Sequence, residues 1–173
     1  MPSLYFKTEG LVMKKMPFGE ADFLIRVFTK DFGKMDVLAR SARKSLSKLN
    51  SHLDILNHIR LQFVKMSPPS DLASERIPTL TDAETIARFD DWFLDADKLS
   101  LAGRALQTID MVVMPGSKDE ELFKIIIDFF GGEQSEKKAI EFLRRFFLHE
   151  GHGDALPPEH EQAILRLWPL LKN

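Results

Sequence analysis

The chain has 173 residues, enough for one large domain or two small ones. It has no cysteine, which excludes disulfides, a thiol nucleophile and any zinc or iron–sulfur site built on cysteine ligands. The formal net charge of −2 conceals an asymmetry, because residues 1–66 carry a net +6 and residues 67–173 a net −8. The basic first part predicts a polyanionic partner.

The polarity of the chain predicts a cytoplasmic protein that does not associate with a membrane. No apolar run in the sequence approaches the roughly 20 residues of a membrane-spanning helix. The opening MPSLYFKTEG is too polar for a secretory signal. We therefore expect a globular protein of the cell interior.

The first part of the chain has the composition of short strands joined by tight turns. Apolar and β-branched runs predict strands over residues 11–16, 23–29 and 35–40, with reversals at Gly19 and Gly33. Alternation of apolar and polar residues predicts a half-buried strand over residues 58–64, after a short helix or turn within 45–53. SerProProSer at 67–70 predicts a turn, and residues 72–80 a last strand limited by Pro78. Five short strands favour a small β-barrel over residues 1–80.

From residue 81 onward the apolar spacing becomes that of helices. Thr81 and Glu84 have capping-box spacing and predict a helix that runs to about Leu94. Apolar stripes predict further helices over residues 99–113, 122–130 and 137–149, and Pro157-Pro158 predicts the start of a short final one. The expected fold class is therefore α+β, with a five-stranded barrel followed by a helical domain over residues 81–173.

Positive charge gathers around the third predicted strand, which suits a track of phosphate contacts. We expect these cations to bind nucleic acid, the alternative being an ordinary solvated surface; they are Lys14, Lys15, Lys34, Arg40, Arg43, Lys44 and Lys48. Aromatic rings near strand ends either stack on bases or belong to the core, namely those of Phe6, Phe18 and Phe32. We assign Phe23, Phe28 and Phe63 to the barrel core.

The sequence offers little for catalysis or for a cofactor. It contains no Walker loop, no GxSxG motif and no HExxH motif, so we expect no enzyme and no cofactor. His149, His152 and His160 are near in sequence, but Gly151 interrupts the helix between them, and we predict no metal site. The acidic residues between Asp90 and Asp97 fall on several faces of a helix and favour a solvated surface.

The pattern from Glu9 to Arg43 resembles the N-terminal domain of the RecO family of bacterial recombination mediators. The matching residues are Glu9-Gly10, Gly19-Glu20-Ala21-Asp22, Phe28-Thr29, Gly33-Lys34, Ala39-Arg40 and Ala42-Arg43. FLRRFFLHEGHGDAL, further on, resembles the family's helix that leads into a glycine-containing loop. The resemblance implies an oligonucleotide-binding (OB) fold followed by a helical domain. Many family members carry a four-cysteine zinc site after the position of Gly153 to Leu156, and we expect that module to be absent here.

The resemblance also implies a function. It implies binding of single- and double-stranded DNA, strand annealing, and loading of recombinase in DNA repair, with the nucleoid as the place of action. Its implied partners are RecR and the acidic C-terminal tail of single-strand-binding protein. For that tail we single out the neighbouring cationic and aromatic residues Arg144, Arg145, Phe146 and Phe147. Two other hypotheses for the function stay open, an adaptor that binds only proteins and an RNA-binding OB-fold protein.

Overall fold

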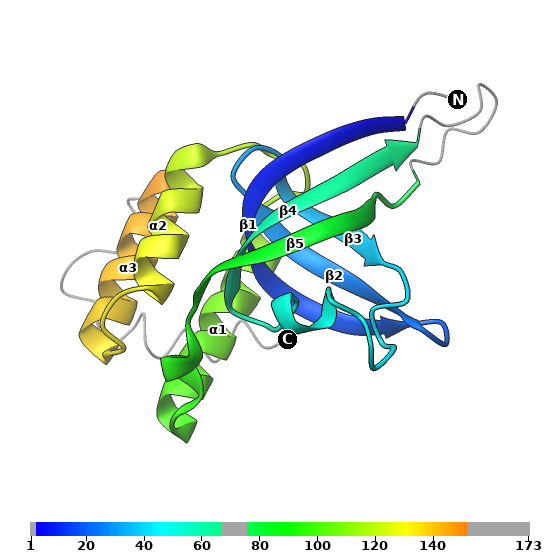
Figure 1. The fold of residues 1–173 in the computed structure, drawn as a ribbon. Helices are drawn as coiled ribbons and strands as arrows, with labels where there is room; N and C mark the ends of the chain where they lie inside the picture. The colour runs from blue at the N-terminus through cyan, green and yellow to red at the C-terminus, as the bar shows by residue number, and fades with distance from the viewer. Residues whose placement is uncertain (1–2, 67–75, 152–173) are drawn as a thin grey trace. The chain divides into compact units, whose positions relative to one another are not determined.

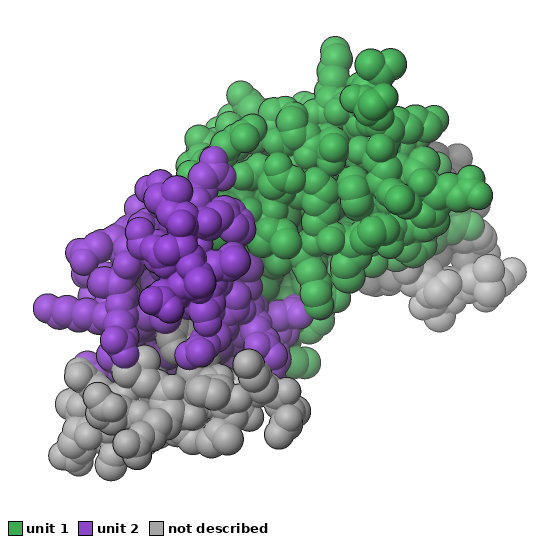
Figure 2. Space-filling model, turned by 90° about the horizontal axis from the view of Figure 1, so that it is seen from below, with its two compact units in different colours: residues 1–88, 114–119 green, residues 89–113, 120–173 purple. Residues whose placement is uncertain are grey.

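A computed structural model describes residues 3–66 and 76–151, and these form five strands and three α-helices. The chain divides into two compact units, coloured separately in Figure 2. The first comprises residues 1–88 and 114–119, and the second residues 89–113 and 120–173. Each unit is described by itself below.

The first unit is a closed five-stranded barrel (Figure 1). Its strands are β1 (Ser3–Phe18), β2 (Asp22–Thr29), β3 (Gly33–Ala39), β4 (Asn57–Met66) and β5 (Thr79–Arg88). They follow the order β1-β2-β3-β5-β4, and only the short β3–β5 contact is parallel. The barrel confirms the OB-type fold expected from the sequence.

Strand β1 is longer than predicted and closes the barrel by pairing with two strands in turn. Its first half pairs with β4 from Ser3 onward, and its second half pairs with β2 as far as Phe18. Gly10 lies where the two ladders overlap, opposite both Thr29 and Ile59. A Cβ atom at Gly10 would collide with the side chain of Val27, so the overlap requires glycine.

The two predicted reversals are confirmed. Gly19 and Gly33 have φ values of 58° and 64°, a backbone conformation that residues other than glycine rarely adopt. Thr29 supports the β2–β3 turn, because its hydroxyl donates to the carbonyl of Gly33 at 2.8 Å and accepts from the Phe32 amide at 3.0 Å. The turn thereby fixes the register of β2 against β3.

The barrel core consists of the inward residues of the alternating strands. They are Val12, Ile25, Val27, Val37, Ile59, Leu61, Phe63 and Leu80, joined by Ala39, Ala42, Leu53 and Ala83. The predicted alternation in β4 is confirmed, since Ile59, Leu61 and Phe63 are fully buried. Phe28 is also fully buried, and Phe23 is half-buried against the core.

The helix predicted from Thr81 to Leu94 is wrong. Residues 79–88 are strand β5, and Glu84 pairs with Arg60 of β4 in the sheet. Capping-box spacing is a local signal, and here the ladder with β4 overrides it. Only Asp90–Phe93 is helical, as the short 3₁₀ segment η2. The short helix or turn expected within 45–53 is the 3₁₀ segment η1 (Asn50–His52).

The second unit contains the predicted helices α1 (Ala96–Val112), α2 (Glu120–Phe130) and α3 (Glu136–His149). Its core is an aromatic chain in which Trp92 contacts Phe129 and Phe130, and Phe129 stacks on Phe142 with a centroid distance of 4.3 Å. The Trp92 indole donates to the Phe130 carbonyl at 2.8 Å, so its polar atom is satisfied.

The strand predicted over residues 72–80 is wrong at residues 76–78, which are not in a strand, because β5 begins only at Thr79. The expectations after Met66 that lie outside the described residues are the turn at 67–70, the start of that strand at 72–75, the histidines His152 and His160, the position of the zinc module at 153–156, and the helix after Pro157. Among the helices that the structure describes, none is long and apolar enough to cross a membrane.

Candidate nucleic-acid interface

The loop after β3 is fastened to the turn between β1 and β2. The Ser41 amide donates to the Asp22 carboxylate at 2.7 Å, and the Arg43 amide donates to the Ala21 carbonyl at 2.9 Å. Between them Ala42 is fully buried in the barrel core. Leu53, after the loop, belongs to the same core. The loop is therefore an ordered part of the barrel; we call residues 40–48 the basic rim.

The side chain of Arg43 adds to this attachment. Its Nη1 atom donates to the Gly19 carbonyl at 2.9 Å, although the residue itself is exposed. One arginine thus joins the basic rim to the turn through both its backbone and its guanidinium group. This bond uses only one of the five N–H donors of the guanidinium group. Arg43 therefore has a structural role and still presents its positive charge at the surface.

Five of the seven predicted cations are exposed, and in four of these five no ion pair or hydrogen bond ties the side chain to other described residues. These four are Lys14 on β1 and Arg40, Lys44 and Lys48 on the basic rim. Their charges are not neutralised by neighbouring carboxylates. A phosphate backbone would therefore meet uncompensated positive charge along the rim.

Lys15 and Lys34 are placed differently. The Lys15 amine forms an ion pair with Asp54 at 2.9 Å and lies 4.8 Å from the centre of the Phe23 ring. Lys34 is only 7% exposed, because residues 114–119 lie along the end of β3 and the Gly116 amide donates to the Lys34 carbonyl. Neither side chain is presented to solvent like those of the rim.

The three aromatic residues considered for base stacking also differ in their surroundings. Phe6 and Phe32 form an edge-to-face pair, both pack on Phe63, and the Lys65 amine lies over both of their rings. These two rings are therefore already engaged within the protein. Phe18 differs, since it stands at the end of β1 beside the turn that holds the basic rim, and it is 45% exposed.

The pairing of β1, β2 and β3 brings together surface residues that the sequence analysis did not single out. Met16, Leu24 and Leu38 are partners across β1, β2 and β3, so their side chains share the outer face of this sheet. The neighbouring row is Lys14, Arg26 and Asp36, in which Arg26 forms a two-pronged pair with Asp36 at 2.8 and 3.0 Å. The alternation of each strand could have placed these apolar residues on one face of their own strand. Only the pairing of the three strands shows that they lie side by side.

On the outer face formed by β1, β4 and β5, carboxylates neutralise the charge of Arg60. Arg60 lies between Glu9 and Glu84, at 3.5 and 3.1 Å. Beside them His58 is nearly buried, with Nε2 at 3.6 Å from Glu9. Burial lowers the pKa of His58, and the attraction of Glu9 only partly opposes this. This face offers little net attraction to a polyanion.

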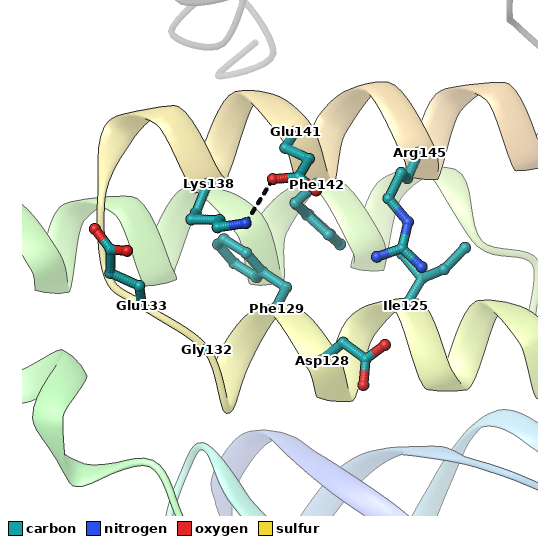
Figure 3. A pocket seen from close by; sticks show the side chains of 9 residues that line it. All are labelled: Ile125, Asp128, Phe129, Gly132, Glu133, Lys138, Glu141, Phe142 and Arg145. Atoms are coloured by element: carbon teal, nitrogen blue, oxygen red, sulfur yellow. Dashed lines mark hydrogen bonds and ion pairs between the residues drawn. The ribbon is translucent and has the colours of Figure 1, made fainter.

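The helical unit has a pocket of about 180 Å³ between α2 and α3 (Figure 3). Phe129 and Phe142 form its apolar wall, and Arg145 lies at one end. Along the α3 side of the pocket Lys138 pairs with Glu141 at 2.8 Å, which lowers the pKa of Glu141 and raises that of Lys138. The pocket therefore combines an aromatic wall with mixed charge.

The four residues singled out on α3 do not share one surface. Arg145 is exposed at the pocket, and Arg144 is half-buried. Phe146 is fully buried, with ring contacts to Phe142 and Phe147, and Phe147 is half-buried. Phe146 therefore supports the helix pair from within and leaves Arg145 as the residue best placed to meet a partner.

Comparison with known proteins relates the barrel to recombination proteins. A family model described as "Recombination protein O N terminal" matches residues 1–89. DNA repair protein RecO of Clostridium acetobutylicum is 31% identical over 143 residues, covering 82% of this chain and 54% of that protein. DNA repair protein RecO of Syntrophus aciditrophicus is 25% identical over 154 residues, covering 87% and 57%.

A shorter match, to DNA repair protein RecO of Streptomyces coelicolor, is 33% identical over 84 residues and covers 49% of this chain and 33% of that protein. The chain thus spans about half, or less, of the length of these relatives. The family match takes in the whole barrel, with the turn at Gly19 and the basic rim. On this match and the closed five-stranded barrel, the chain belongs to the RecO family.

Proposed function

We propose that this protein is a DNA-binding mediator of recombination in DNA repair. In this proposal it binds single- and double-stranded DNA, promotes the annealing of strands and assists the loading of recombinase. The observation that carries the proposal is the basic rim, where Arg40, Lys44 and Lys48 stand exposed on a loop fastened to an OB-type barrel. Names of the RecO relatives support the link to DNA repair.

The mechanism is electrostatic and makes no covalent bond. Each lysine or arginine that meets a phosphate releases condensed counterions, and this release favours binding at low salt. Because the rim is already held by Ser41 and Arg43, little ordering of the loop opposes binding. Neutralising phosphates also lowers the repulsion between two strands, which is what annealing requires.

Titration of labelled oligonucleotides at several salt concentrations tests the proposal. If the four exposed cations other than Arg43 each contact one phosphate of a single strand, log K should fall with log salt at a slope of roughly −3. Folded protein that binds no DNA at low salt would contradict the proposal and favour the protein-only adaptor. Tighter binding of RNA than of DNA of the same sequence would favour the RNA-binding reading.

We propose further that the helical unit binds the acidic C-terminal tail of single-strand-binding protein, and that RecR is a second partner. The tail would place its carboxylates at Arg145 and its apolar residues against the aromatic wall of the pocket in Figure 3. Charge reversal by Arg145→Glu, alone and with Arg144→Glu, should abolish binding of a tail peptide. Lys124→Glu, an exposed position on α2, is the control. Unchanged peptide binding in the double variant would rule out this site.

A further inference from the structure

The first half of β1 has a backbone edge that no other described residue pairs with. From Ser3 to Lys7 the strand pairs with β4 on one side, whereas its ladder with β2 begins only at Gly10. On that second side no backbone hydrogen bond joins Ser3–Lys7 to another described residue. In Figure 1 this part of β1 runs beside β4 at the margin of the barrel. We call Ser3–Lys7 the open edge, because an unpaired strand edge can accept a further strand.

The backbone groups at the open edge follow from the connection between β2 and β3. The Lys30 amide donates to the Glu9 carbonyl at 2.9 Å, so the backbone groups of Glu9 point away from β4. In an antiparallel ladder, alternate residues direct both their N–H and their C=O group to the same side. The backbone groups of Ser3, Tyr5 and Lys7 therefore point outward from the open edge. At Glu9 the connection between β2 and β3 occupies this side, so the open edge ends there.

The open edge carries little of the charge that usually protects an unpaired strand. Its single charged residue is Lys7. Tyr5 is 72% exposed and Leu4 is 56% exposed, on opposite faces of the strand. Phe6 shares the face of Leu4 and packs against the barrel core. Exposed apolar side chains beside unpaired backbone groups make this segment a template for another strand.

The open edge complements a second copy of itself. A two-fold axis at Tyr5 places this residue opposite Tyr5 of the second copy, with the two strands antiparallel. Lys7 then faces the uncharged Ser3 of the second copy and lies diagonal to that copy's Tyr5 ring. On the other face Leu4 lies opposite Phe6 in both directions. The two Lys7 residues are four positions out of register and therefore about 13 Å apart, a distance at which salt screens their repulsion.

We propose that two copies of this chain associate through the open edge of β1, paired antiparallel about Tyr5. The Tyr5 pair and the two pairs of Lys7 with Ser3 each exchange two backbone hydrogen bonds. This pairing joins the β1–β4–β5 sides of two barrels into one continuous sheet. The inference goes beyond the proposed function and does not depend on DNA binding. The basic rim is fastened to the turn at the other end of β1, so both copies keep it accessible.

Sedimentation equilibrium of the full chain at several concentrations tests the association. Five residues a side bury less than the roughly 1,600 Å² of a standard interface, so the dimer should dissociate with a Kd of about 10 μM to 1 mM. Tyr5→Lys and Tyr5→Glu should each weaken dimerisation by roughly 5- to 50-fold, because each removes the aromatic pair and sets like charges at the two-fold axis.

A mixture of the two charged variants separates pairing from any other effect of the substitutions. In an equimolar mixture lysine faces glutamate at the axis, so a dimer that contains one chain of each variant should form more readily than either variant alone dimerises. Phe18→Lys is the control, because it places the same charge at an exposed ring on the other end of β1 and should dimerise like the parent chain. Circular dichroism checks that each variant is folded.

The absence of cysteine from the chain allows a second test, of the register. Facing residues of a hydrogen-bonded antiparallel pair have Cα atoms about 5.5 Å apart, within the range of a disulfide. Tyr5→Cys should therefore form a disulfide-linked dimer on mild oxidation. Lys7→Cys is the control, because about 13 Å separates it from its counterpart and a disulfide cannot span that distance.

Three results would overturn the inference. A parent chain that stays monomeric at about 1 mM would leave the open edge to a strand of a different protein. Charged variants that dimerise like the parent, or whose mixture gains nothing over each alone, would place the contact elsewhere. Equal oxidation of Tyr5→Cys and Lys7→Cys would reject the register. Titration with DNA is a separate measurement, so the proposed function and this inference can fail independently.

Discussion

The guanidinium of Arg43 donates from Nη1 to the carbonyl oxygen of Gly19 at 2.9 Å, joining positions 24 residues apart in the chain. The Arg43 amide donates to Ala21 in the same turn. The most strongly attached cation of the basic rim is thus the one that holds the rim in place. The exposed cations Arg40, Lys44 and Lys48 therefore lie on a loop whose backbone is held in place.

Replacing Arg43 by lysine should loosen this attachment while keeping the charge. Lysine lacks the planar fork of arginine, so we expect a loss of about 0.5–1 kcal/mol in the free energy of unfolding, measured by urea denaturation. Arg40→Lys is the control, because the Arg40 side chain has no hydrogen-bond partner among the described residues. Equal stability of the two variants would show that the Gly19 bond contributes nothing measurable.

The double substitution Lys44→Ala with Lys48→Ala should weaken binding of single and double strands to a similar degree. Each lysine that contacts a phosphate contributes about 0.7 to the salt slope for a single strand and about 0.9 for a duplex. We therefore expect the slope to become shallower by about 1.4 for single-stranded DNA, as measured by fluorescence anisotropy. Lys124→Ala with Lys137→Ala, at exposed positions of α2 and α3, is the charge-matched control, and a slope that changes equally in both double variants would argue against the rim.

Gly33→Ala should destabilise the barrel. Gly33 has a φ of 64°, and a Cβ atom there would collide with the backbone of Ser117. Strain in this region costs about 1–3 kcal/mol before the collision is added, which urea denaturation would detect. Gly103→Ala in α1 is the control, and it should raise the free energy of unfolding. Nothing lies within 4 Å of the added Cβ atom, and alanine is more favourable than glycine inside a helix by about 1 kcal/mol. A stable Gly33→Ala protein would mean that residues 114–119 move away readily.

Acidification should destabilise the protein partly through His58. Burial lowers the pKa of His58 in the folded state, whereas in the unfolded chain it is near 6.5. The unfolded state then binds more protons, so this contribution to stability is present above pH 6.5 and is lost as the pH falls from there toward the folded-state pKa. His58→Gln should reduce the difference in unfolding free energy between pH 7.5 and pH 5.5, followed by circular dichroism. An unchanged difference would assign the pH dependence to other groups.

Much of the fold could be predicted from local patterns. Strand β4 followed from the alternation that buries Ile59, Leu61 and Phe63, and α2 from the apolar face that includes Leu122 and Ile126. Gly19 and Gly33 marked the reversals, because few other residues adopt positive φ. The motif pattern likewise indicated the family and the basic rim before any contact was known.

Local patterns failed where partners distant in sequence decide the outcome. Thr81 and Glu84 carry a helix-start signal, but pairing with β4 makes their segment a strand. Lys34 and Lys44 look alike in sequence, yet residues 114–119 cover Lys34 while Lys44 stays exposed. A cation's availability depends on what folds against it, and sequence spacing does not record that.

Alternation, turn glycines and charge are local properties, so the barrel class, its family and the charge of its rim can be predicted without the structure. Tertiary structure decided which cations face solvent and which residues share a face. Met16, Leu24 and Leu38 are up to 22 positions apart along the chain and become one strip only through strand register. Register is set by packing of the opposite, buried side of these strands, so this outer strip is a consequence of the core.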